Sequence, residues 1–174
     1  MRSHFNSDKI YLHGYFPAYM TIAVQLGPEA KVCELGVKNG ESLRMWQSLF
    51  PLGEITGVDN DPASVFPPRA KKVIASQDNP VLAELGPFDL IVDDASHEGL
   101  LTREAFRILW PRVSPGGFYV VEDWFVGLER QRNDDAYDPK MLETVANFLT
   151  LLTKNGDCES VTYRYGLAIL RRRA

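Results

Sequence analysis

Short apolar runs alternate along the chain with segments whose hydrophobic residues recur at helical spacing. Continuous apolar runs bounded by turn residues are typical of the buried strands of a parallel sheet, whereas recurrence every three or four residues is typical of helices. The pattern predicts strands over 31–36, 54–59, 70–75, 88–94 and 116–123. It predicts helices over 41–50, 100–113 and 138–156, and a shorter one near 80–85. Two last strands are expected within 160–172, with a turn at Gly166.

This order of elements indicates the fold class. Strands that alternate with helices predict an α/β, Rossmann-like fold, with a mostly parallel seven-stranded sheet and helices on both faces. No repeat, low-complexity tract or linker divides the 174 residues, so we expect a single domain. In open sheets of this kind ligands bind beyond the carboxyl ends of the strands, near the point where the strand order reverses. Those strand ends are therefore where functional residues are sought.

Composition narrows the class of partner. The net charge of −4 argues against a surface for nucleic acid or anionic membrane and leaves a small molecule as the expected partner. The two cysteines, Cys33 and Cys158, lie in apolar segments and are expected to be buried, reduced thiols. No apolar run approaches the ~18 residues of a membrane span, and the first residues do not resemble a signal peptide. We therefore expect a cytoplasmic protein.

The segment ELGVKNG, which follows the first strand, indicates a nucleoside site. Gly36 allows a sharp turn and a close approach of a ligand to the backbone, and Gly40 relieves the start of the next helix. Lys38 occupies the second glycine position of the dinucleotide fingerprint, which disfavours a pyrophosphate on this loop but not S-adenosylmethionine. Asp59 ends the second strand, where a carboxylate can accept both ribose hydroxyls. The competing interpretation of Asp59 is a solvated acid that caps a strand.

The fourth and fifth strands end in two pairs of acids, Asp93–Asp94 and Glu122–Asp123. These strands are expected to be neighbours, and four carboxylates crowded together are unfavourable unless protonated, hydrated or bridged by a cation. Oxygen ligands without clustered Cys or His favour Mg²⁺ over Zn²⁺. Because consecutive strand residues face opposite ways, we favour Asp94, Glu122 and Asp123 as ligands and expect Asp93 to face the nucleoside pocket.

His97 follows Asp94 by three residues and is a candidate general base. An imidazole titrates near pH ~6.5 and can accept a proton at neutral pH. The competing interpretation is an ordinary surface residue before a helix. The acids around His97 favour the catalytic role.

At these residues the sequence resembles class I S-adenosylmethionine-dependent methyltransferases, and more narrowly the metal-dependent sugar O-methyltransferases of macrolide biosynthesis, the mycinamicin and macrocin type. The matching segments are SDKIYLHGYFPAY, VCELGVKNGESLRMW, ITGVD, FDLIVDDASH and LWPRVSPGGFYVVEDW. DDASH with VVEDW is the specific part of the resemblance, since ELGVKNG marks only the broad fold.

The resemblance implies S-adenosylmethionine and Mg²⁺ as cofactors and assigns the site residues. It implies metal ligands at Asp94, Glu122 and Asp123, the general base at His97, the ribose acid at Asp59 and the cofactor loop at Glu34 to Gly40. The cofactor residues predicted in all are Glu34, Gly36, Gly40, Ser42, Asp59, Asn60, Ser76, Gln77 and Asp93. It also implies that an N-terminal segment, 1–30, covers the active site of a methyltransferase domain, 31–174. The substrate residues expected are Asp8, Lys9, His13, Tyr15 and Trp124.

Three departures from the family pattern limit this transfer. Ala75-Ser76-Gln77 stands where relatives often have Gly-Asp-Gln, which places adenine contacts by Ser76 and Gln77 in doubt. The macrolide enzymes carry large N-terminal extensions, and we expect the assembly and sugar-binding surfaces of those extensions not to transfer to this sequence. The polar stretch 125–139 either closes over the substrate or is simply mobile.

The sequence thus predicts a Mg²⁺-dependent O-methyltransferase that acts on a hydroxyl of a sugar or polyol-like natural product, with His97 as base. Three alternatives remain: a relative of the cephalosporin-pathway methyltransferases, a catalytically silent module that binds S-adenosylmethionine or S-adenosylhomocysteine, and an NAD-binding Rossmann domain. A homodimer is a further expectation.

Overall fold

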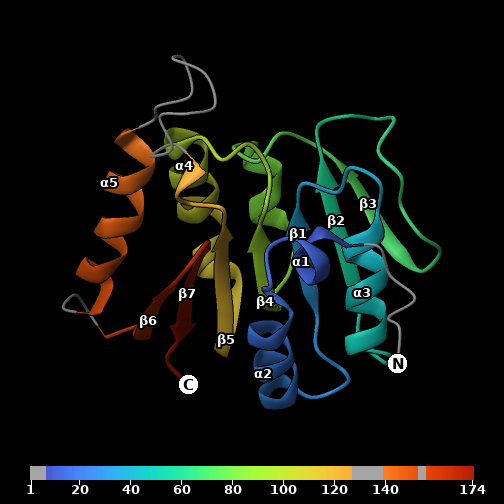
Figure 1. Ribbon diagram of the computed structural model, residues 1–174, viewed down its shortest axis with the longest axis horizontal. Helices are drawn as coiled ribbons and strands as arrows, with labels where there is room; N and C mark the ends of the chain where they lie inside the picture. The colour runs from blue at the N-terminus through green and yellow to red at the C-terminus, as the bar shows by residue number, and fades with distance from the viewer. Residues whose placement is uncertain (1–6, 127–138, 153–155) are drawn as a thin grey trace.

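A computed structural model describes residues 7–126, 139–152 and 156–174. Its seven strands form one sheet in the order β3-β2-β1-β4-β5-β7-β6 (Figure 1). The strands are β1 (Val32–Leu35), β2 (Ile55–Asp59), β3 (Ala70–Ile74), β4 (Phe88–Asp93), β5 (Val113–Glu122), β6 (Cys158–Arg164) and β7 (Leu167–Arg172). β1 to β5 run parallel, and β7 is antiparallel to both β5 and β6. The predicted Rossmann-like sheet is confirmed.

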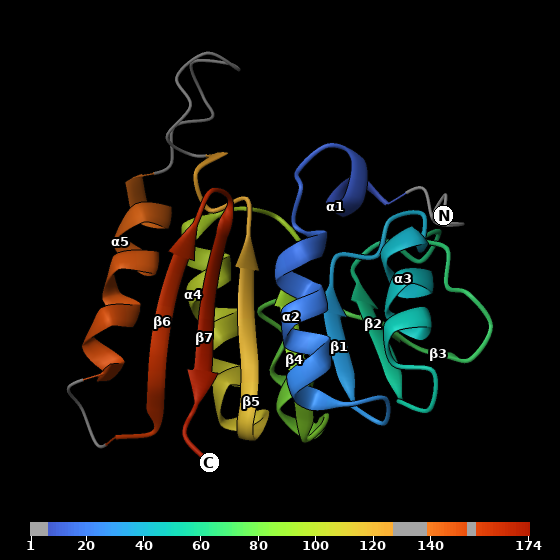
Figure 2. The ribbon, with the colours of Figure 1, turned by 60° about the horizontal axis from the view of Figure 1, so that its bottom comes forward.

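Helices cover both faces of this sheet. α2 (Phe16–Leu26) and α3 (Glu41–Leu49) lie on one face, and α4 (Gly99–Leu109) lies on the other (Figure 2). α5 (Pro139–Asn147) packs against α4. The shorter helices are α1 (Asp8–Tyr11) and the 3₁₀ segments η1 (Pro80–Glu84), η2 (Trp110–Arg112) and η4 (Phe148–Leu152).

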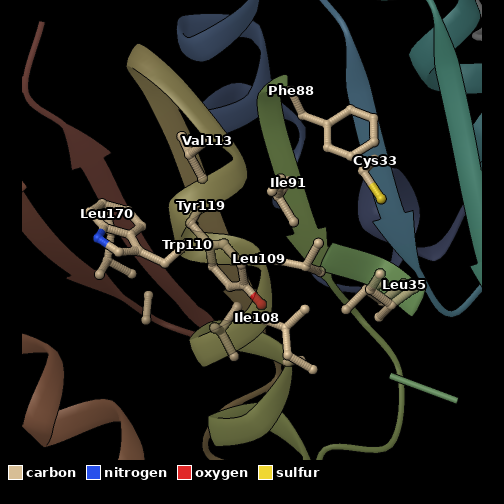
Figure 3. Packing of buried hydrophobic residues seen from close by; sticks show 14 of the residues in the cluster. Cys33, Leu35, Phe88, Ile91, Ile108, Leu109, Trp110, Val113, Tyr119 and Leu170 are labelled. Carbon is tan, nitrogen blue, oxygen red and sulfur yellow. The ribbon is translucent and has the colours of Figure 1, made fainter. Parts of the chain in front are cut away.

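Each face of the sheet has its own apolar core because strand residues alternate between faces. Leu90 and Val92 of β4 pack with α2 and α3, whereas Ile91 between them packs with α4. Figure 3 shows the second core, in which Ile91, Leu109 and Tyr119 fill the space between the strands and α4. Burial on both faces keeps the central strands in place and brings their carboxyl ends to one edge.

The differences from the predicted elements have local causes. β5 begins at Val113, three residues earlier than predicted, because Val113 already pairs with Phe88 of β4. The predicted helix 138–156 is shorter: α5 gives way to η4 at Phe148. α2 was not predicted, since its apolar residues lie on every side and Val24 is 80% exposed, which hides the helical period.

Cys33 and Cys158 are both buried and carry no disulfide, as expected. Within the described ranges, none of the helices combines the length and the apolar character that a bilayer crossing demands.

Candidate active site

The candidate active site lies where the strand order reverses. β1 pairs with β4 and β4 with β5, and the register sets Leu35 beside Asp93 and Asp93 beside Val121. The chain leaves β1 toward β2 and β3, then returns to β4 on the other side of β1. Such a switch point leaves a crevice beyond the carboxyl ends of the two strands. Two neighbouring cavities occupy this position.

The first cavity, of about 210 Å³, has the lining expected of a nucleoside pocket. Its walls include the predicted cofactor residues Gly36, Asp59, Asn60, Ser76 and Gln77. The second cavity, of about 400 Å³, is more polar and holds the predicted catalytic groups. It is lined by Ser7, Gly36, Val37, Lys38, Asn39, Glu41, Ser42, Asp94, Ala95, His97 and Asp123. Gly36 and Ala95 line both cavities, so the two adjoin.

Gly36 brings the strand-end loop against β4. Its φ is +87°, and a Cβ atom at this position would lie 2.1 Å from the carbonyl oxygen of Asp94. Only glycine fits such an approach without moving the backbone. The turn at Gly36 therefore holds the loop after β1 against the loop that contains Asp94.

Asp59 organises the same loop from the end of β2. Its Oδ2 accepts hydrogen bonds from the N–H groups of Val37 (2.8 Å) and Lys38 (3.0 Å), and its Oδ1 accepts one from Asp61 (2.9 Å). Partial burial raises the pKa of Asp59, but the backbone hydrogen bonds together lower it by more. The pKa of Asp59 therefore lies below its ordinary value. Asp59 lines the first cavity, and its contact with ribose stays a prediction.

Asp59→Asn is expected to destabilise the protein at pH 7, because an amide cannot accept all three N–H groups. The lowered folded-state pKa means that the stabilisation by the carboxylate is present above the unfolded-state pKa and is lost as pH falls through the folded-state pKa. The difference in unfolding free energy between wild type and variant should therefore shrink below about pH 4. Urea unfolding between pH 3 and pH 7 measures it, and a difference that is constant with pH would contradict this role.

Asp93 is not among the residues that line the two cavities, and its predicted place at the nucleoside pocket stays a prediction. Its side chain is 2% exposed and accepts a hydrogen bond from Nε2 of Gln77 (3.3 Å). Gln77 in turn accepts one from the N–H of Ser96 (3.1 Å). Burial raises the pKa of Asp93 to about 7, although the N–H of Ala95 opposes this. Asp93 thus holds Gln77, which is the residue that reaches the cavity.

Lys9 lies at the centre of a buried acidic cluster, which we define as Glu34, Asp94 and Glu122. Its Nζ is 3.3 Å from Oε1 of Glu34, 2.5 Å from Oδ2 of Asp94 and 2.9 Å from Oε1 of Glu122. Burial lowers the pKa of Lys9, but the three carboxylates raise it more, so the ammonium form is held. Lys9 therefore joins the N-terminal segment to the ends of three strands, and its predicted contact with substrate stays a prediction.

Glu122 is bound by a second donor as well as by Lys9. Tyr19 of α2 donates a hydrogen bond to the same Oε1 that faces Lys9. Burial raises the pKa of Glu122 well above its ordinary value, even though Lys9 lowers it. Glu34 has a raised pKa for the same reason and accepts a hydrogen bond from Ser42 (2.6 Å).

At the second cavity the structure brings together two acids and a histidine, a group that shares only Asp94 with the buried acidic cluster. Asp94, His97 and Asp123 each offer a ligand atom, and the three atoms lie within 4.8 Å of one another. Glu122 is outside this group, and its predicted role as a metal ligand stays a prediction. His97 Nε2 lies 3.8 Å from Oδ1 of Asp94, the oxygen that does not face Lys9. These atoms form the candidate cation site.

Backbone strain marks two members of this group. His97 has φ +57° and Asp123 has φ +50°, in the left-handed region that residues other than glycine seldom occupy. Such conformations cost of order 1–3 kcal/mol and concentrate at functional sites. Tyr15 donates a hydrogen bond to Oδ1 of Asp123, and His13 Nδ1 lies 3.8 Å from the same oxygen. The N-terminal segment therefore helps to hold Asp123 in place.

The remaining predicted residues lie as follows. Gly40 is the left-handed N-cap of α3, and Trp124 is half-buried against the core that includes Tyr119. The side chain of Asp8 and most of the stretch 125–139 lie outside the described residues. Tyr19 and Ser7 were missed; the spacing of Tyr15 and Tyr19, four residues apart on one helical face, was the available signal for Tyr19.

Comparison with known proteins agrees with this fold. The mycinamicin methyltransferase MycE, solved with Mg, S-adenosylhomocysteine and mycinamicin VI, superposes with a TM-score of 0.76 at 26% identity over 94% of this chain and 50% of that one. A tetracenomycin-C rhamnosyl 3'-O-methyltransferase of Streptomyces olivaceus is 40% identical over 132 residues, which are 67% of this chain. Mycinamicin VI 2''-O-methyltransferase of Micromonospora griseorubida is 35% identical over 127 residues.

The chain has the class I methyltransferase fold and is a homologue of sugar O-methyltransferases. It spans about a third of the length of the curated relatives, 34% and 32% for the two named above. No family model matches the sequence. S-adenosylhomocysteine-bound PaMTH1 of Podospora anserina superposes with a TM-score of 0.69 at 16% identity, which supports the methyltransferase fold alone.

Proposed function

We propose that this protein transfers a methyl group from S-adenosylmethionine to a hydroxyl of a glycosylated natural product, with the help of a divalent cation. One observation supports this most strongly: two acids and a histidine converge at the mouth of a polar cavity that adjoins a nucleoside-sized one. The names of the homologues support the class of acceptor, since they act on rhamnosyl groups of tetracenomycin C and on mycinamicin VI. The cytoplasmic location and the homodimer stay predictions.

The residues that would hold the cofactor come from three strand ends. Gly36 lets the backbone approach the ligand, Asp59 presents a carboxylate whose pKa is lowered by backbone hydrogen bonds, and Gln77 presents an amide from a fixed position. The first cavity is therefore suited to adenosine, and the shared wall at Gly36 and Ala95 leads toward the second cavity. In this proposal the reacting end of the cofactor points along this shared wall toward Asp94, His97 and Asp123.

The donor set fits a hard divalent cation. Asp94 presents Oδ1 on the side of His97 while its Oδ2 binds Lys9, and Oδ1 of Asp123 accepts a hydrogen bond from Tyr15. Carboxylate oxygens are the ligands that Mg²⁺ prefers. When bound, such a cation holds the acceptor hydroxyl and lowers its pKa, while the cofactor supplies an electrophilic methyl group. Asp94 and Asp123 are the proposed ligands.

His97 is the proposed general base. Its side chain is 26% exposed at the cavity wall, so an acceptor can reach it, and its Nε2 lies 3.8 Å from Oδ1 of Asp94. As the acceptor oxygen forms its bond to the methyl carbon and the carbon–sulfur bond breaks, the hydroxyl proton passes to His97. Tyr15 and Lys9 keep the two acids in position during this step.

Asp123→Asn tests the cation site. We expect Mn²⁺ affinity, measured by isothermal titration, and methyl transfer to fall together by roughly 10–100-fold, because an amide is a weaker ligand than a carboxylate. The affinity for S-adenosylhomocysteine should stay unchanged, since Asp123 does not line the first cavity. Glu98→Gln is the matched control, because Glu98 is exposed and adjacent to His97 but outside the cation group. The proposed mechanism would be refuted if Asp123→Asn retained full methyl transfer, or if methyl transfer did not depend on added metal.

A further inference from the structure

Aromatic side chains gather where β5 ends and β6 turns into β7. Phe125 stacks on Tyr165 with ring centroids 4.7 Å apart and planes at 29°. Trp124 meets Phe125 and Tyr163 edge to face, at 6.5 Å and 6.3 Å. We name the stacked pair of Phe125 and Tyr165 the aromatic wall.

The aromatic wall adjoins the candidate cation site. Gly166, next to Tyr165, lies so close to Tyr15 that a Cβ atom there would be 1.7 Å from the Tyr15 hydroxyl. That hydroxyl donates a hydrogen bond to Asp123, and Asp123 precedes Phe125 by two residues. β5 and β7 pair through Glu122 and Leu167, so the turn before β7 lies at the same edge of the sheet as the other strand ends (Figure 2).

Packing within the fold does not account for the wall. Tyr163 is bound into the structure, since its hydroxyl donates to the carbonyl oxygen of Val145 (2.5 Å). Tyr165 is 74% exposed, and its ring contact among the described residues is the one with Phe125. A large ring held by stacking, but left facing solvent beside a polar cavity, offers an apolar contact that a ligand can cover.

We infer that the aromatic wall binds the apolar portion of the acceptor, next to the sugar that carries the reacting hydroxyl. This inference rests on the proposed function. The hydroxyl must reach Asp94, His97 and Asp123, and the cavity around these residues is predominantly polar. The part of the acceptor beyond the sugar has to extend out of this cavity, and the wall is the apolar surface next to Asp123, which Phe125 follows by two residues and which binds Tyr15 beside Gly166. An aromatic face contributes by stacking and by burial of apolar area.

The wall is tested by binding, which needs no turnover. Phenyl and methyl rhamnosides are titrated into wild type, Tyr165→Ala and Tyr165→Phe, all saturated with S-adenosylhomocysteine and Mg²⁺, with saturation-transfer NMR as the readout. We expect wild type to prefer the phenyl glycoside by roughly three- to tenfold, the range for one aromatic contact. Tyr165→Ala should lose this preference and Tyr165→Phe should keep it. Leu52→Ala, an exposed apolar residue in the turn before β2, is the control and should keep it.

Three results would overturn the inference that the aromatic wall binds the acceptor. These are equal binding of the two glycosides to wild type, equal weakening of both by Tyr165→Ala, and binding of neither glycoside. Failure of the proposed function looks different. In that case the phenyl preference and its loss in Tyr165→Ala persist, while no methyl transfer occurs from S-adenosylmethionine.

Discussion

Lys9→Met is expected to lower the free energy of unfolding by about 3–5 kcal/mol, the range for breaking a buried ion pair by removal of one partner. The Lys9 side chain is 1% exposed, and its ammonium faces all three carboxylates of the buried acidic cluster. Methionine matches the length of the aliphatic stem but leaves Glu34, Asp94 and Glu122 without their counter-charge. Urea unfolding at pH 7 measures the loss.

Two comparisons separate charge from packing. Lys31→Met removes an exposed lysine, 3.7 Å from Glu54, and should cost no more than about 1 kcal/mol. Adding Glu122→Gln to Lys9→Met should recover part of the loss, because a neutral amide removes the cost of burying or protonating a carboxylate that has lost its counter-charge. If Lys9→Met were as mild as Lys31→Met, Lys9 would not be the counter-charge of the cluster.

His97→Gln is expected to reduce methyl transfer by roughly 10²–10⁴-fold, the contribution typical of a general base. Glutamine keeps a polar side chain near Asp94 but cannot take up the proton. Because Asp94 and Asp123 are the proposed ligands, Mn²⁺ affinity should change little. Initial rates and isothermal titration on the same preparations provide the two readouts.

Asp123→Asn and Glu98→Gln are the reference variants against which His97→Gln is compared. The first should lose metal affinity and activity together, and the second should retain both. If His97→Gln lost metal affinity as Asp123→Asn does, His97 would be a third ligand, as its place within the 4.8 Å group allows, and the base would lie elsewhere.

The N-terminal segment contributes more to the site than its resemblance to relatives implied. Lys9, Tyr15 and Tyr19 each bind a carboxylate at a strand end: Lys9 binds Asp94 and Glu122, Tyr15 binds Asp123, and Tyr19 binds Glu122. The three residues recur at spacings of six and four in the sequence, which by itself predicts no common target. Their convergence is a product of the turn at Gly14 and the packing of α2 on the sheet.

Asp93 and Glu122 show that the alternation of side chains along a strand does not predict the partners of a strand-end acid. Alternation correctly separates Asp93 from Asp94, because successive side chains point to opposite faces. It does not say what lies on each face: Gln77 lies beside Asp93, and Lys9 and Tyr19 lie beside Glu122. All three partners come from distant segments: Gln77 is 16 residues from Asp93, and Tyr19 is 103 residues from Glu122.

The amino-acid sequence by itself determined the sheet, its winding and the edge that carries the chemistry, because apolar period and turn residues are local properties of the chain. It also determined which acids lie at strand ends, since Asp59, Asp94 and Glu122 directly close or follow apolar runs. Only the tertiary structure decided how the acids divide: Lys9 binds Glu34 and Glu122, while Asp94 turns one oxygen to Lys9 and the other toward His97. The physical reason is that a buried charge takes whichever counter-charge the packed fold brings within a few ångströms, and that distance is not written in the spacing of residues along the chain.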